Sequence, residues 1–202
     1  METSDSLDKK FSFEEIFNPP GGFLMWLVVL MEIFMFGALI TIVARYRHFN
    51  LTIFQAETGH LHLRDGLIFT LSLLLSGFLA AEGVRFYFAD QRRKSFFYFI
   101  ASTVFGLSFL VLKILDFVSK SELGLGIEKN DFWQYYWLLM GFHFLHVMVG
   151  VFILLSICLG IYKNKFEDAE FSVRGGILFW HMCDIVWLII FPLFYLGGTL
   201  HE

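Results

Sequence analysis

The chain has 202 residues, of which 57% are hydrophobic and only 17% are charged, and its formal net charge is −4. An average soluble domain carries about 25% charged residues, and a water-soluble protein of this size could not bury so much apolar surface. The composition also excludes a disordered tail, a basic nucleic-acid-binding domain and a disulfide-stapled secreted module. We therefore expect an integral membrane protein.

Five segments are long and apolar enough to cross a bilayer as helices, which takes about 20 residues each. In chain order they cover residues 22–44, 66–88, 96–117, 132–161 and 176–198, which together form one domain over 22–198. They lack the period-2 alternation of membrane β-strands. The predicted fold class is therefore an all-α membrane protein, a bundle of five transmembrane helices. Residues 1–21 form a polar N-terminal segment, which we interpret either as an amphipathic stretch on the membrane surface or as a flexible tail.

The basic residues beside the spans predict the orientation, because positively charged loops stay on the inner side of the membrane. With the N-terminus inside, the inner side carries nine basic residues and the outer side carries five. The inner set is Lys9, Lys10, Arg85, Arg92, Arg93, Lys94, Lys163, Lys165 and Arg174. The outer set is Arg45, Arg47, Arg64, Lys120 and Lys129. The N-terminus is therefore predicted to lie inside and the C-terminus outside.

Glu32 lies near the middle of the first span, with no basic residue within one turn. An ionised group at this depth costs about 2.5–3.5 kcal/mol on insertion scales. Glu32 is therefore either protonated or bonded to a donor from another helix. One interpretation is a carboxyl that exchanges protons or contacts lipid, and the other is a hydrogen-bond clamp between helices.

Two further polar pairs lie inside the last two spans. His143 and His146 are three residues apart and share one face of the fourth helix, and His181 and Asp184 have the same spacing in the last helix. If the two helices are neighbours, three imidazoles and a carboxylate meet in one polar core. Such a core fits a zinc or copper site, a heme ligated by histidines from facing helices, or a structural hydrogen-bond network. The expected partners in a network are the indoles of Trp133, Trp137, Trp180 and Trp187.

The remaining membrane-depth charges lie near helix ends. Glu82 and Arg85, and likewise Lys113 and Asp116, are three residues apart, so we expect each to form an ion pair or to extend toward the membrane surface. The sequence contains no phosphate-binding loop, no Ser/His/Asp set and no dinucleotide-binding glycine pattern. Gly141 and Gly150 are expected to let another backbone come close to the fourth helix.

Two helices resemble those of a known family. The stretch GFHFLHVMVGVFILL resembles the G-x-H-x-x-H-V-x-x-G helix of cytochrome c oxidase subunit III. The run WHMCDIVWLIIFPLFYL is similar to the family's final helix, W-H-F-x-D-x-x-W with a tyrosine further on, and Glu32 occupies the glutamate position of the family's S-E-x-x-x-F segment. Departures mark a divergent member: Phe69 replaces an asparagine, and the family's Gln, Glu and Tyr are replaced by Lys113, Asp116 and Phe117.

This resemblance implies a non-catalytic subunit of a heme–copper terminal oxidase, with no catalytic centre of its own, in a bacterial plasma (inner) membrane. It implies that heme and copper reside in partner subunits, that this chain binds phospholipid, and that it packs on catalytic subunit I and supports assembly and proton uptake. A larger respiratory supercomplex is a further expected partner, and nucleic acid is not. The resemblance also favours a buried polar network over a heme site for Glu32, His143, His146, His181 and Asp184.

Two alternative functions differ in class from an oxidase subunit. One is an accessory subunit of a nitric oxide reductase system, which has a related five-helix build. The other is an independent membrane electron carrier with its own heme or copper. The co-purifying large subunit distinguishes the first alternative, and metal analysis of the chain distinguishes the second.

Overall fold

A computed structural model of the chain describes residues 21–163 and 170–196, and all regular structure in these ranges is helical. The long helices are α2 (Phe23–Phe49), α4 (Leu63–Phe88), α5 (Arg92–Glu122), α6 (Asp131–Lys163) and α7 (Gly175–Tyr195). A short helix, α3 (Leu51–Thr58), follows α2, and a π-helical turn, η1 (Glu170–Arg174), leads into α7. Five helices in the described residues are long and apolar enough to cross a membrane, which confirms the expected number of spans. Residues 197–198 of the last expected span lie outside the described residues. The predicted N-terminal segment up to residue 20 lies outside the described residues, and the orientation stays a prediction.

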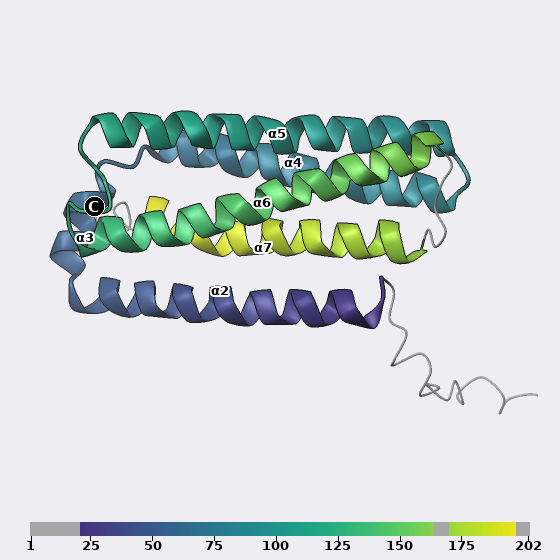
Figure 1. The fold of residues 1–202 in the computed structure, drawn as a ribbon. Helices are drawn as coiled ribbons and strands as arrows, with labels where there is room; N and C mark the ends of the chain where they lie inside the picture. Colours follow the sequence, from purple (N-terminus) through teal and green to yellow (C-terminus); the bar gives the residue numbers. More distant parts are fainter. Residues whose placement is uncertain (1–20, 164–169, 197–202) are drawn as a thin grey trace, which may run out of the picture.

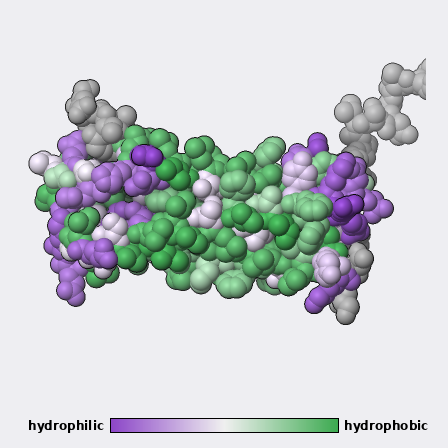
Figure 2. All heavy atoms as spheres, turned by 90° about the horizontal axis from the view of Figure 1, so that it is seen from above, coloured by the Kyte–Doolittle hydropathy of each residue, from purple (hydrophilic) through white to green (hydrophobic). Residues whose placement is uncertain are grey.

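The long helices lie side by side and form an elongated bundle (Figure 1). The shortest span of the bundle, Phe171–Tyr195, has 25 residues, which at 1.5 Å per residue is about 37 Å, enough for a bilayer core of about 30 Å. Figure 2 shows a broad hydrophobic belt on the visible face, with hydrophilic residues gathered at both ends. A helix satisfies its own backbone hydrogen bonds, as hydrocarbon requires. The chain is therefore an integral membrane protein.

Helices α4 and α5 make the most extensive contact in the bundle, and small polar residues hold them together. The Oγ of Ser76 donates to the carbonyl of Ser102 at 2.7 Å, and the Oγ of Ser102 donates to the carbonyl of Ser76 at 2.8 Å. Nearer the α4–α5 turn, the hydroxyl of Ser95 donates to the carbonyl of Gly83 at 2.8 Å. Small residues let two helices approach closely enough for such bonds, which are favourable where no water competes.

Helix α7 packs against α2, α4 and α6, and its two tryptophans are fully buried. Trp180 occupies the space that Gly150 of α6 and Gly106 of α5 leave open: a Cβ at Gly150 would lie 2.5 Å from Cε3 of Trp180. Gly150 does make room for a close neighbour, but the prediction of another backbone is wrong there, because the side chain of Trp180 occupies the space. The same expectation for Gly141 is wrong, because a Cβ there would meet nothing within 4 Å.

Helix α2 lies at the edge of the bundle and is the least buried span. Its buried residues are Val29, Phe36 and Val43, which recur every seven positions and form one seam against the bundle. The rest of its apolar surface is exposed, as in Phe34, of which 80% is accessible. Since most of its surface contacts no other helix of the chain, α2 depends on a few interactions for its position.

The sequence analysis did not predict helix α3, which lies between the first two expected spans. Its residue Phe54 is completely buried and connects three elements. The Phe54 ring lies 5.0 Å from that of Phe132 at the start of α6 and 6.0 Å from that of Phe194 near the end of α7. This short helix closes one end of the bundle, and eight residues are too few to give a span-like hydropathy signal.

The tight packing at Gly150 gives a matched pair of substitutions. Gly150→Ala should lower the free energy of unfolding by about 1–3 kcal/mol, because the added methyl group collides with the immobile Trp180 ring. Gly141→Ala in the same helix should be neutral or stabilising by up to about 1 kcal/mol, since the position is open and alanine favours helix. Unfolding of each variant in mixed micelles with increasing denaturing detergent measures the difference. Equal effects at the two positions would contradict the packing described.

Candidate functional site

Glu32 of α2 meets His146 of α6 inside the membrane. The Nε2 of His146 lies 3.0 Å from Oε2 of Glu32. The Nδ1 of His146 lies 2.8 Å from the carbonyl oxygen of Phe142, which can only accept, so Nδ1 carries a proton. Nε2 of His146 and Oε2 of Glu32 are close enough for an ion pair, although Oε2 of Glu32 makes no hydrogen bond of regular geometry with any described residue. Glu32 thus has a contact partner from another helix, His146 of α6, which was one of the two expected alternatives.

His143 lies one turn from His146 but does not join this pair. Only 1% of it is accessible, and its ring stacks on that of Trp187 with centroids 5.4 Å apart. The edges of Phe36 and Phe109 close two further sides, with centroids 6.1 Å and 6.0 Å away. Neither ring nitrogen has a hydrogen-bond partner among the described residues. His143 therefore behaves as an aromatic packing residue enclosed by other rings.

The second polar pair, His181 and Asp184 of α7, faces α4. The Nδ1 of His181 lies 3.2 Å from Oδ2 of Asp184. The carboxylate fits against Gly77 of α4, where any side chain would overlap it. No hydrogen bond or ion pair between described residues joins this pair to Glu32 or His146. What the sequence predicted as one polar core is, in the structure, two separate pairs and an isolated imidazole.

The tryptophans do not serve as the expected indole partners of the histidines. The indole N–H of Trp187 donates to the hydroxyl of Thr70 at 2.9 Å, and that of Trp137 donates to the carbonyl of Leu125 at 2.8 Å. The indole nitrogen of Trp180 has no hydrogen-bond partner in the described part of the chain. The prediction was wrong because these indoles point along other helix faces, which the sequence alone does not specify.

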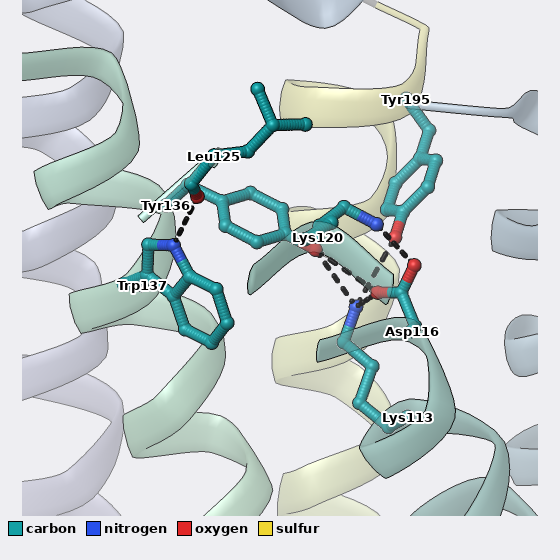
Figure 3. A network of polar contacts seen from close by, with 7 residues as sticks. All are labelled: Lys113, Asp116, Lys120, Leu125, Tyr136, Trp137 and Tyr195. Carbon is teal, nitrogen blue, oxygen red and sulfur yellow. Dashed lines mark hydrogen bonds and ion pairs between the residues drawn. The ribbon is translucent and has the colours of Figure 1, made fainter. Parts of the chain in front are cut away.

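A third group of charges is buried at the end of the bundle that α3 closes, and Figure 3 shows it. Lys113 of α5 is only 1% accessible, and its Nζ lies 2.9 Å from Oδ2 of Asp116. The same ammonium donates to the hydroxyls of Tyr136 in α6 and Tyr195 in α7, each at 3.2 Å. Lys120 pairs with the other oxygen of Asp116. The network therefore connects α5, α6 and α7 by bonds to charged groups.

The expected ion pairs differ in their surroundings. Glu82 and Arg85 pair at 2.7 Å, as expected, and Arg85 is 68% accessible at the end of its helix. Lys113 and Asp116 also pair as expected, but Lys113 extends into the protein rather than toward the membrane surface. Lys120 lies four residues after Asp116 on the same face, a spacing that indicates its participation.

Sequence reasoning missed a hub at Glu57 in α3, which accepts three hydrogen bonds from the start of α6 and the residues before it. The donors are Nζ of Lys129 at 2.7 Å, Nδ2 of Asn130 at 2.6 Å and Nε1 of Trp133 at 2.8 Å. Burial raises the pKa of Glu57, but these hydrogen bonds and the Lys129 charge together lower that pKa below its usual value. The donors follow Glu57 by more than 70 residues, so no local pattern reveals them.

The described residues contain no group of three or more His, Cys, Asp or Glu side chains arranged to hold a metal ion. The polar sites in these ranges are instead contacts between pairs of side chains of the chain itself. Such contacts can hold helices in position.

Known proteins of one family resemble this chain. Residues 22–199 match the family described as cytochrome c oxidase subunit III. The chain is 30% identical over 183 residues to the cytochrome bo(3) ubiquinol oxidase subunit 3 of Buchnera aphidicola, an alignment that covers 88% of this chain and 87% of the relative. It is 23% identical over 180 residues to a probable quinol oxidase subunit 3 of Staphylococcus aureus, covering 88% and 89%.

Removal of a carboxylate should destabilise the fold more in the buried network around Asp116 than in the exposed Glu82–Arg85 pair. Asp116→Ala should lower the free energy of unfolding by about 3–5 kcal/mol, because it leaves two buried lysines without a counter-charge. Glu82→Ala should cost less than about 1 kcal/mol, since Arg85 remains hydrated. Detergent-induced unfolding of the two variants checks this order, and a Glu82 effect as large as that of Asp116 would contradict it.

The lowered pKa of Glu57 predicts a dependence of stability on pH. The ionised carboxylate stabilises the fold fully above its ordinary pKa of 4.5, and this stabilisation is lost as the pH falls through the lower pKa of the folded protein. The variant Glu57→Gln should therefore be less stable than the original chain at pH 7, and the gap should narrow only below about pH 4.5. Unfolding midpoints measured from pH 7 to pH 3 test this. A constant gap over that whole range would show that the charge of Glu57 contributes nothing.

Proposed function

The chain belongs to the cytochrome c oxidase subunit III family, and from this membership we propose that it serves a quinol-oxidising member of the heme–copper terminal oxidases. It is a non-catalytic integral-membrane subunit of such an oxidase. The observation that carries this conclusion is the match over residues 22–199, which includes all five spans. Both relatives named above are subunits of quinol oxidases, and this supports a quinol rather than a cytochrome as the electron donor.

The two alternative functions receive less support. The named relatives are oxidase subunits, not accessory proteins of a nitric oxide reductase. An independent electron carrier would need ligands for heme or copper. His143 cannot supply one without rearrangement, because aromatic rings enclose it, and Nε2 of His146 already contacts Glu32.

The partners follow from membership in the family. The chain assembles with other subunits of the terminal oxidase, and heme and copper belong to those subunits. We propose that it packs on the catalytic subunit I and lies in a bacterial inner membrane with its N-terminus inside. The bacterial sources of the relatives support this location, and the distribution of basic residues supports this orientation.

We propose that the Glu32–His146 pair fixes α2 on the bundle and supports proton supply to subunit I. The pair brings a carboxyl and an imidazole together inside the membrane, and it joins α6 to α2, the least buried of the described spans. Buried His143 and Asp184 and the partly accessible His181 complete the proposed set of polar residues within the membrane, in which they maintain helix packing. Loss of the pair should therefore affect assembly and proton delivery rather than electron transfer itself.

Phospholipid is the proposed bound ligand, and a cavity of about 280 Å³ between α4 and α5 supports it. Asp65, Asp116 and Lys120 form part of its wall, and Leu112 and Leu115 contribute apolar surface. Asp65 can bind the amine of a lipid headgroup, while the leucines contact acyl chains. Lys120 is buried and paired with Asp116, so a headgroup that carries an amine fits this arrangement.

Affinity purification tests the proposed function directly. A tagged copy of the full chain, expressed in a bacterium that produces the native oxidase and extracted in mild detergent, should co-purify with a heme-bearing large subunit. The heme spectrum of the complex and mass-spectrometric identification of its subunits are the readouts. Isolation of the chain with no heme-bearing partner, or with a nitric oxide reductase, would overturn the proposal.

Replacement of the buried carboxyls tests their proposed role. Glu32→Ala and Asp184→Ala should leave initial quinol oxidation nearly unchanged, because electron transfer takes place in subunit I. Both should weaken subunit association or shorten the period of turnover before activity is lost. Ser156→Ala is a matched control, since that hydroxyl already bonds the Phe152 carbonyl within α6. Normal assembly and normal turnover lifetime in both carboxyl variants would count against the proposed role.

A further inference from the structure

One face of α7 exposes a polar group in the middle of the membrane. The side chain of His181 is 39% accessible, although its span runs from Phe171 to Tyr195. It lies 10 residues from one end of this span and 14 from the other, which at 1.5 Å per residue is about 15 Å and 21 Å. An imidazole at this depth faces hydrocarbon, where an unsatisfied polar atom costs several kcal/mol.

The open atoms of this pair define what could satisfy them. Nδ1 of His181 is 3.2 Å from Oδ2 of Asp184, so Nε2 is the ring nitrogen with no partner among the described residues. The second carboxylate oxygen, Oδ1 of Asp184, also has no hydrogen-bond partner among the described residues, but it is buried and out of reach of a group outside the bundle. Nε2 accepts or donates a hydrogen bond according to which ring nitrogen carries the proton. The group that complements it is a polar side chain able to hydrogen-bond to Nε2.

Two other polar residues on the accessible surface of the spans form hydrogen bonds within their own helices. The hydroxyl of Thr41 donates to the carbonyl of Gly37 at 2.7 Å, and that of Ser156 donates to the carbonyl of Phe152 at 2.8 Å. Nε2 of His181 makes no such bond with any described residue.

The surroundings of His181 form an apolar face that another helix could cover. Ile185, Leu188 and Ile189 follow at one and two turns on the same side of α7, and they are 55%, 44% and 49% accessible. Gly77 of α4 lies directly beside the pair and adds no side chain to the surface. This face therefore consists of one polar spot in an apolar stripe, a common pattern where transmembrane helices associate.

We propose that this face of α7 is the docking surface for a transmembrane helix of another oxidase subunit, which places a hydrogen-bonding side chain against Nε2 of His181. The inference rests on the proposed function, because an oxidase complex supplies the partner chain. A lipid does not meet the requirement, since its acyl chains carry no hydrogen-bonding group and its headgroup lies at the ends of the span. A hydroxyl, amide, indole or basic side chain on a partner helix does.

Photo-crosslinking in the assembled oxidase tests the proposal. A benzophenone-bearing phenylalanine replaces Ile185, one turn from His181, in the tagged full chain expressed with the rest of the complex. After irradiation of native membranes, mass spectrometry should find it joined to a transmembrane segment of another oxidase subunit. Adducts with lipid alone, or with a second copy of this chain, would overturn the docking surface.

The same preparation separates failure of this inference from failure of the proposed function. Heme in the unirradiated complex together with lipid-only adducts means that the proposed function holds and the docking surface does not. A preparation without a heme-bearing partner overturns both.

A substitution tests the hydrogen bond itself. His181→Phe keeps an aromatic ring but removes both nitrogens, and it should reduce several-fold the amount of partner subunits retained through detergent purification. The matched control Thr41→Val removes a hydroxyl already satisfied within α2 and should retain partners at the original level. Full retention in His181→Phe would contradict the hydrogen bond. If His181→Phe does not fold, the crosslink at Ile185 decides, since it leaves His181 in place.

Discussion

Hydrocarbon offers no hydrogen bonds, so each polar side chain inside the membrane needs a partner from protein, and the arrangement of this bundle depends on that requirement. Ser76 and Ser102 exchange hydrogen bonds between α4 and α5, and the Lys113 ammonium reaches tyrosines on α6 and α7. Glu32 and His146 join α2 to α6. Apolar packing alone distinguishes poorly between neighbouring helices in lipid, because lipid tails are as apolar as leucine. These polar contacts therefore determine which helices are neighbours.

The polar contacts are distributed unevenly over the bundle. Helices α4 to α7 share hydrogen bonds, buried tryptophans and a charged network, whereas the described contacts of α2 with the bundle include the seam of Val29, Phe36 and Val43 and the Glu32–His146 pair. A subunit of this kind needs a rigid body and lipid- or partner-facing surfaces more than it needs a reactive centre. The oxidase chemistry takes place in other chains. The described polar groups of this chain join its helices to one another.

The sequence predicted the helical class, the five spans and the pairing of residues three apart, such as Glu82 with Arg85 and Lys113 with Asp116. It did not predict α3, the Glu57 hub or the contact of Lys113 with Tyr195. Hydropathy and helical spacing are properties of neighbouring residues, and these features join residues that lie far apart along the chain. The single polar core expected from His143, His146, His181 and Asp184 failed for the same reason. A three-residue spacing places two side chains on one face of a helix, but it does not say which neighbour that face meets.

By itself, then, the sequence determined that the chain lies in a membrane, how many times it crosses and which few ionisable residues enter the interior. These follow from local composition, because about 20 apolar residues in succession have no other stable environment. Only the tertiary structure decided that Glu32 pairs with His146, that His143 is enclosed by aromatic rings and that His181 faces outward. The rotation of each helix about its own axis decides these contacts. That rotation results from packing among all the helices at once, which no single segment encodes.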